Sequence, residues 1–203
     1  MTSSLTERED LQIKSGSPST RLTVADLEQL QGILCEAHLD YQLELVEGKI
    51  IIMGPSDIVS SEIGAEFGRL LGNWVKPRQL GRVFESSGGF ILANSDLRAP
   101  DVSFVTADRL KQSKRYFAEL VPDLVVEIKS QSDRLKPLGE KLLSFIELGA
   151  KVGILIDPDE RTVTVYNPTA EPVVLRDGDM ISIPELFPGW EVAVTELWSI
   201  EFE

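Results

Sequence analysis

The stretch "DLVVEIKS", residues 123–130, limits what this chain can fold into more than any other segment. Side chains alternate between the two faces of a strand, so the apolar side chains at positions 124, 126 and 128 share one face. Glu127 and Lys129 share the other face. The segment therefore predicts a buried or half-buried strand with one fully apolar face. Its two charges form either an ion pair at a sheet edge or part of a functional site.

The rest of the chain alternates between helical and strand patterns. Apolar residues at helical spacing predict helices within 56–77 and 130–149, a short helix begins after Thr23, and a basic helix is predicted over 107–120. β-prone runs between turn residues predict a hairpin at 41–53 and further strands, at 81–86, 89–93, 100–105, 152–157 and 162–167. The fold class is α/β (mixed α+β): a central mixed β-sheet flanked by helices, with extra N- and C-terminal strands. One domain is expected over 21–203, after a polar, disordered leader at 1–20.

Composition excludes some classes of protein. No segment approaches the roughly 20 apolar residues of a membrane span, and no secretory signal is visible, so we expect a cytoplasmic protein that does not bind membranes. The single cysteine, Cys35, allows no internal disulfide. The formal net charge of −13 argues against broad adhesion to nucleic acid. It does not exclude nucleic acid as a substrate, because metal ions or a local basic groove can offset an acidic whole.

A second carboxylate stands at the start of another apolar run. Asp101 follows Pro100 directly, and aspartate is depleted in strands and costly to bury unless it is paired or bound to a metal. An Asx-turn is the alternative explanation. The 127 − 101 = 26 residues from Asp101 to Glu127 allow the chain to return on a neighbouring strand. The two carboxylates and the Ile128 carbonyl would suit Mg²⁺ or Mn²⁺, and Lys129 could stabilise charge on a phosphate.

These residues resemble a known motif. Pro100-Asp101 followed by Glu127-Ile128-Lys129 resembles the PD-(D/E)xK signature of the restriction-endonuclease-like superfamily. Flanking blocks extend the resemblance over residues 23–198 to the Uma-type putative restriction endonucleases, and they include "LVEGKI", "RAPDVSFV" and "EKLLSFIELGAKVGILID". The resemblance implies a restriction-endonuclease-like core and Mg²⁺-dependent cleavage of DNA. It implies that Asp101 and Glu127 are metal ligands and that Lys129 is the catalytic lysine.

Two further residues are candidates for the same site. The superfamily often adds a glutamate from a helix before the first core strand, and Glu66 is favoured here over Glu62 because it lies at the rim of the apolar face. A solvated helix carboxylate is the alternative. Lys141 falls inside an apolar helical stripe, and many members of the family resembled keep a lysine on this helix instead of at position 129. Either lysine could be the catalytic one, with the other in an ion pair, or Lys141 could extend to solvent.

The sequence thus predicts a metal-dependent DNA endonuclease, expected as a homodimer because cleavage of two strands usually needs two sites. The alternatives are a non-catalytic nuclease-fold protein that acts as a binding or regulatory module, and an enzyme acting on small phosphates. The basic run at 109–116 is either a solvated helix face or a contact surface for DNA phosphates.

Overall fold

The computed structural model describes residues 21–39, 41–110 and 117–199. The predicted leader at 1–20 and most of the basic run at 109–116 lie outside these ranges. The elements before the central strand are α1 (Val24–Glu36), β1 (Gln42–Val46), β2 (Lys49–Met53), α2 (Ile58–Val75), β3 (Gly81–Glu85), β4 (Phe90–Ile91), β5 (Leu97–Arg98) and β6 (Val102–Thr106). The remaining elements are β7 (Leu124–Ile128), α3 (Leu135–Glu147), β8 (Val152–Asp157), β9 (Thr162–Asn167), β10 (Ala170–Leu175), β11 (Met180–Ser182), β12 (Glu191–Ala193) and the 3₁₀ helix η1 (Val194–Leu197).

A six-stranded mixed sheet forms the body of the molecule, in the order β10-β9-β8-β7-β6-β3. Strands β7 and β8 are parallel, and each other neighbouring pair is antiparallel. The segment "DLVVEIKS" supplies β7, and all five residues of this strand are buried. The predicted mixed sheet between helices is therefore confirmed.

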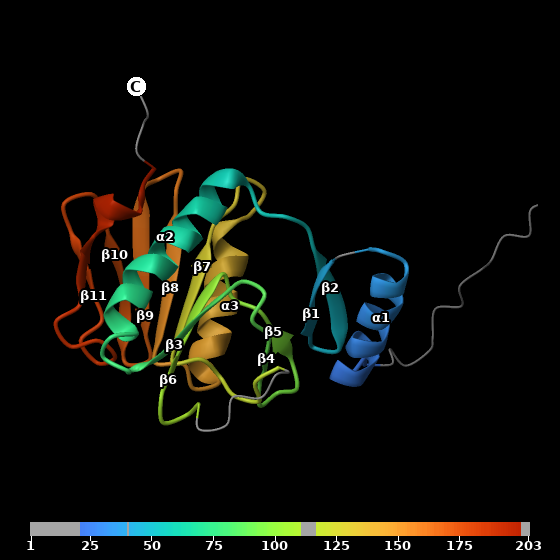
Figure 1. Ribbon diagram of the computed structural model, residues 1–203. Helices are drawn as coiled ribbons and strands as arrows, with labels where there is room; N and C mark the ends of the chain where they lie inside the picture. Colours follow the sequence, from blue (N-terminus) through green and yellow to red (C-terminus); the bar gives the residue numbers. More distant parts are fainter. Residues whose placement is uncertain (1–20, 40, 111–116, 200–203) are drawn as a thin grey trace, which may run out of the picture.

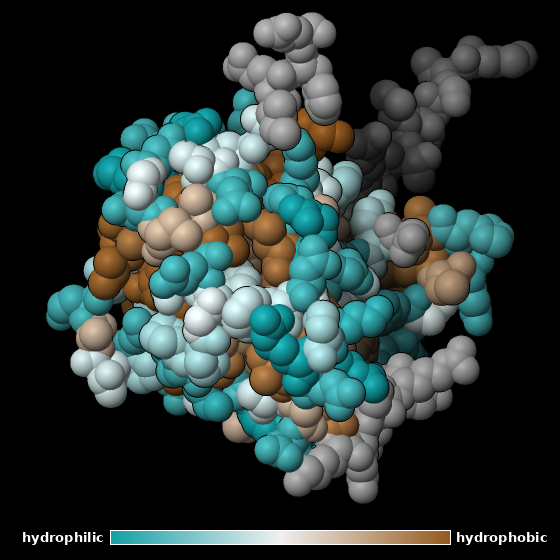
Figure 2. Space-filling model, turned by 60° about the vertical axis from the view of Figure 1, so that its left-hand side comes forward, coloured by the Kyte–Doolittle hydropathy of each residue, from teal (hydrophilic) through white to brown (hydrophobic). Residues whose placement is uncertain are grey.

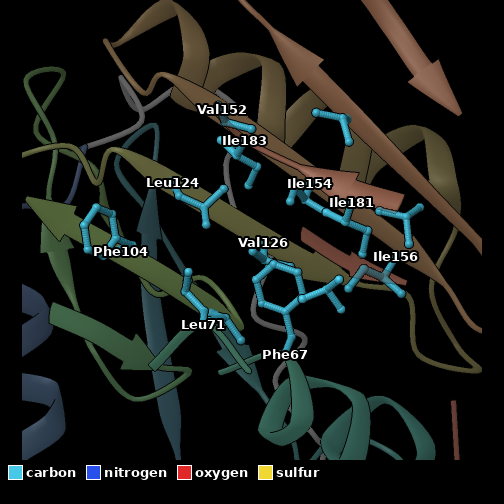
Figure 3. Packing of buried hydrophobic residues seen from close by; sticks show 14 of the residues in the cluster. Phe67, Leu71, Phe104, Leu124, Val126, Val152, Ile154, Ile156, Ile181 and Ile183 are labelled. Carbon is cyan, nitrogen blue, oxygen red and sulfur yellow. The ribbon is translucent and has the colours of Figure 1, made fainter. Parts of the chain in front are cut away.

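Helix α2 covers one face of this sheet (Figure 1). It begins after Asp57, whose carboxylate accepts hydrogen bonds from the backbone N–H groups of Val59 and Ser60. Its apolar stripe packs against the even-numbered side chains of β7, and Figure 3 shows Phe67 beside Val126. The helix thereby covers the wholly apolar face that the sequence predicts.

Helix α3 covers the opposite face. Leu142 and Phe145 are fully buried there, in the same cluster as Val125 of β7. The helix ends before Gly149, whose φ of +114° is a conformation that glycine adopts readily. This packing places α3 over the face of β7 that carries Glu127.

A second sheet, of order β2-β1-β5-β4, forms the part of the molecule that α1 covers (Figure 1). Leu27 of α1 packs against Leu43 and Leu45 of β1 and against Leu97 of β5. Only the segment 99–101 separates β5 from β6, so the two sheets are joined directly beside the start of β6.

The C-terminal segment completes the core on the α2 side. Phe187 and Trp190 are buried, and the Phe187 ring lies 4.8 Å from that of Phe104 in β6. Figure 2 brings the β10–β11 side of the molecule forward, and there hydrophobic and hydrophilic side chains are interspersed. Among the described residues, no helix combines the length and the apolar content that a membrane span requires.

The basic helix predicted over 107–120 is wrong where the structure describes it. Residues 107–110 form a turn, and Ala118 makes a β-bridge with Phe90 instead of a helical turn. The backbone N–H of Ile91 donates to the Ala118 carbonyl at 2.8 Å. Tertiary pairing with β4 therefore outweighs the helix propensity of this segment.

Phe67 offers a direct test of the core packing. Phe67→Ala should lower the free energy of unfolding by about 3–5 kcal/mol, because the Phe67 side chain is 1% exposed and its loss leaves a cavity. Urea denaturation measures this change. Ile58→Ala on the same helix is the control, because Ile58 is 84% exposed and should shift stability by no more than about 0.5 kcal/mol. Equal effects of the two substitutions would contradict the packing described.

Candidate active site

Asp101 and Glu127 are brought together by the pairing of β6 with β7. The register pairs Val102 with Val126 in an antiparallel ladder, so the preceding residue, Asp101, lies opposite Glu127. Opposite residues in such a ladder point to the same face of the sheet. The two carboxylates predicted from the sequence therefore lie side by side at the end of the central strand.

A backbone hydrogen bond fixes the Asp101 side chain. The N–H of Ile128 donates to Asp101 Oδ2 at 2.7 Å. Burial raises the pKa of Asp101, although this hydrogen bond and the nearby Lys141 act in the opposite direction. Asp101 is thus a carboxylate in fixed orientation that lacks a close cationic partner of its own among the described residues.

Lys141 reaches the two carboxylates from α3. Its ammonium nitrogen lies 2.9 Å from Glu127 Oε1 and 3.1 Å from Glu44 Oε1, and its side chain is 14% exposed. Lys141 thus forms ion pairs with both carboxylates, and it donates a hydrogen bond to Glu44. The lysine that stands out within the apolar stripe of α3 therefore points at the site.

Glu44 is a further member of the site, and it was not among the residues predicted from the sequence. It comes from β1 of the second sheet, is 3% exposed, and accepts a hydrogen bond from the Ala99 backbone N–H at 2.8 Å. Arg98 Nη1 lies 3.8 Å from its other oxygen. The sequence did contain a sign of this role, because Glu44 stands between two leucines in a predicted strand. A carboxylate is as unusual at that position as Asp101 is at the start of its apolar run.

The electrostatics of this cluster favour the binding of a proton or of a cation. Burial, together with the neighbouring Asp101 and Glu44, raises the pKa of Glu127 to about 7, although Lys141 lowers it. Burial alone would lower the pKa of Lys141, but Glu127 and Glu44 outweigh burial and raise it. Lys141 therefore stays charged at neutral pH, whereas Glu127 loses its proton only as the pH approaches about 7.

Lys129 lies at the end of β7 but takes part in a different ion pair. Its ammonium contacts the carboxylate of Asp159, in the turn between β8 and β9. The hydrogen bond and charge of Asp159 raise the pKa of Lys129. The structure therefore brings Lys141, rather than Lys129, to Asp101 and Glu127.

The two helix glutamates also lie apart from the cluster. Glu66 pairs with Arg69 one turn along α2, and that pairing lowers the pKa of Glu66. Glu62 accepts a hydrogen bond from the Ser199 hydroxyl at 2.7 Å. The face of α2 nearest Asp101 instead carries small residues, and a Cβ added at Gly64 would lie 3.2 Å from Ile128 Cδ1.

An open cavity of about 610 Å³ gives access to the cluster. Asp101, Glu127, Ile128 and Lys141 all line it, together with polar residues of the segment between β7 and α3. Its size is in the range of ligand sites of proteins. The four residues are therefore accessible to a substrate from one side.

The donor set can be compared with what a divalent ion requires. Within the described ranges, no group of three carboxylate, imidazole or thiol side chains is placed so that it could hold a metal ion by itself. Asp101 and Glu127 offer two carboxylates, and Mg²⁺ is typically held by one or two carboxylates with several waters retained. The carboxylates of Asp101, Glu127 and Glu44 face two cationic groups, Lys141 and Arg98. Arg98 is shared with Asp96, so negative charge is in excess, and a bound cation would offset it. The residues fit a weakly caged Mg²⁺ or Mn²⁺.

Comparisons with known proteins bear on the fold and the family of the chain. The crystal structure of a putative nuclease belonging to DUF820 from Anabaena variabilis is similar to this chain, with 25% identity and a TM-score of 0.70, covering 80% of this chain and 94% of that one. A cryoEM structure of a DrdV–DNA complex has 17% identity and a TM-score of 0.38 over 68% of this chain and 11% of that one, a level that does not establish a common fold. None of the curated protein sequences matches the chain.

The family is identified by the sequence as a whole. A family model described as "Uma2: Putative restriction endonuclease" matches residues 24–195, which include every residue of the cluster. The chain belongs to the Uma2 family of putative restriction endonucleases.

Proposed function

We propose that the protein is a metal-dependent DNA endonuclease, with Asp101, Glu127 and the Ile128 carbonyl as metal ligands. The observation that carries the proposal is the cluster of the buried Glu127 and Glu44 and the half-buried Asp101 around Lys141, at the edge of an open cavity. When bound, Mg²⁺ or Mn²⁺ would lower the pKa of a water and polarise the phosphate. The family membership and the nuclease similar in fold support the same reaction class.

Lys141 takes the role of the catalytic lysine in this proposal. Its raised pKa means that it cannot accept a proton at neutral pH, so it acts as a hydrogen-bond donor to a phosphate oxygen or an attacking water. Glu44 is a positioning residue: it holds the ammonium 3.1 Å away and is itself oriented by the Ala99 N–H. Lys129 is a structural residue that ties the end of β7 to the β8–β9 turn.

The proposed DNA substrate rests on the family and not on the charge of the chain. A chain with a net charge of −13 gains little from long-range attraction to DNA, so local contacts and the bound cation must hold the phosphate. Cleavage of both strands of a duplex would take two copies of the site, which the proposed homodimer would supply.

Cleavage of labelled DNA tests the function itself. We expect cleavage with Mg²⁺ or Mn²⁺, none with EDTA, and a loss of at least roughly 100-fold in Asp101→Asn, a substitution of equal size that removes the charge. Circular dichroism checks that the variant is folded. Activity that persists in EDTA or in Asp101→Asn would contradict the mechanism, and a wild type inactive with both metals would favour the non-catalytic binding module.

The two lysines give a matched pair of variants. Lys141→Met should lower the cleavage rate by roughly 100-fold or more, whereas Lys129→Met should stay within a few-fold of the wild type. Single-turnover rates under saturating Mn²⁺ make the comparison. Glu66→Gln is a further control that should retain activity, because Glu66 pairs with Arg69 away from the cavity. The reverse pattern, with Lys129→Met inactive, would contradict the assignment.

The raised pKa of Glu127 predicts how stability depends on pH. Between the ordinary value of 4.5 and about 7, the unfolded chain releases this proton while the folded protein keeps it. The contribution of Glu127 to stability is therefore present below 4.5 and is lost as pH rises to about 7. We expect added Mn²⁺ to raise the melting temperature most above pH 7, where the carboxylate is ionised.

Thermal melts over this pH range, with and without Mn²⁺, measure the effect. Glu127→Gln should flatten this part of the pH dependence and remove the gain from Mn²⁺. An equal Mn²⁺ effect in wild type and Glu127→Gln would contradict the proposed ligand.

A further inference from the structure

A second cavity, of about 550 Å³, adjoins the active-site cavity. The two share a common wall, since five residues line both of them: Gln42, Met53, Gly54, Pro55 and Ala99. A substrate whose phosphate lies at Asp101 and Glu127 would therefore have its neighbouring group at the mouth of this second cavity. We refer to this second cavity as the side pocket.

The lining of the side pocket is neutral and carries two aromatic rings. Tyr41, which is 43% exposed, and Phe117 line it, as does Gln31 of α1. Among the described residues that line the pocket, none is charged. The chemistry therefore suits a flat, uncharged group with polar edges and does not suit a second phosphate.

Contacts with the rest of the fold fix part of the pocket lining. A Cβ added at Gly89 would lie 2.5 Å from Phe117 Cδ1, so only glycine allows the ring to lie this close to the backbone. Phe117 also packs against the α1–β1 core. The amide nitrogen of Gln42 donates to the Ser86 carbonyl, which ties the shared wall to the segment after β3. Phe117 and this wall are thus held in place before any ligand binds.

We infer that the side pocket receives an unpaired nucleobase of the DNA strand, next to the phosphate that is cleaved. This inference rests on the proposed nuclease function. Proteins hold unpaired bases by stacking them on aromatic side chains and by hydrogen bonds to the base edges, which Tyr41, Phe117 and the glutamine amides can supply. A base in a duplex is stacked and paired and cannot enter, so the preferred substrate is single-stranded or locally unpaired DNA.

The test removes the base from the substrate and, separately, side chains from the pocket lining. A fluorescein-labelled single-stranded oligonucleotide is cleaved with Mn²⁺ and the cut position is mapped. Two derivatives then carry a tetrahydrofuran abasic residue on the 5′ or the 3′ side of that position. We expect one of the two to be cleaved roughly tenfold more slowly than the intact strand, the size of one base–aromatic stack.

Variants link this loss to the pocket. Tyr41→Ala and Gln31→Ala should slow cleavage of the intact strand, Tyr41→Ala by roughly tenfold, with little further effect on the abasic strand. Gln29→Ala is the matched control, because Gln29 is exposed on the same helix and does not line the pocket, and it should cleave as the wild type does.

The outcomes separate the two proposals. Equal rates on intact and both abasic strands would overturn the base pocket and leave the nuclease function intact. Equal slowing of intact and abasic strands by Tyr41→Ala would also overturn it, because the tyrosine would then act on the fold and not on the base. Failure of the wild type to cleave any strand with Mg²⁺ or Mn²⁺ would overturn the nuclease function, and the base pocket with it.

Discussion

The ammonium of Lys141 is the point on which the arrangement of the site depends. It lies between Glu127 of β7 and Glu44 of β1, and so links α3, the central strand and the second sheet through one buried charge. Buried ion pairs are retained only where partners compensate the cost of desolvation. Here the partners are in excess, since Asp101 adds a third carboxylate that Lys141 approaches less closely. The same excess that makes the free site costly makes it receptive to a divalent cation.

This view reconciles the acidity of the chain with a nucleic-acid substrate. Long-range steering of DNA is weak for a protein with a net charge of −13. Under the proposed function, binding would come from short-range contacts: a cation at the carboxylates, the donor at Lys141 and the aromatic lining of the side pocket. Such a division suits a nuclease that acts on exposed, unpaired strands more than one that scans duplex DNA.

Local patterns in the sequence predicted the parts of the fold that depend on local physics. The alternation in 123–130 indicates the buried strand and its two faces, and the apolar stripes indicate α2 and α3 with little error at their ends. The helix predicted for the basic segment after β6 was wrong because Ala118 pairs with Phe90 of β4, which is distant in sequence. Such a backbone pairing is not encoded in the local sequence.

The same distinction between local patterns and long-range contacts applies to the residues of the site. The spacing from Asp101 to Glu127 allows the two to lie on neighbouring strands, and the resemblance to the PD-(D/E)xK signature implied that they act together; the β6–β7 register brings them side by side. The direction of Lys129 depends on the β8–β9 turn, where Asp159 lies 30 residues further along the chain. Glu44 reaches the site only because the second sheet folds against the first, over a separation of 97 residues from Lys141. Long-range contacts of this kind leave only weak traces in a single sequence, such as one carboxylate in an apolar run.

The proposed function requires that the carboxylates at the end of β7 hold a divalent cation. Anomalous diffraction from crystals grown with Mn²⁺ tests this most directly, because it locates the ion without assuming any activity. We expect an anomalous peak between Asp101 and Glu127, bordered by the Ile128 carbonyl, and no such peak in crystals of Asp101→Asn. An occupied Mn²⁺ site elsewhere with none at this pair, or a peak unchanged in Asp101→Asn, would contradict the account.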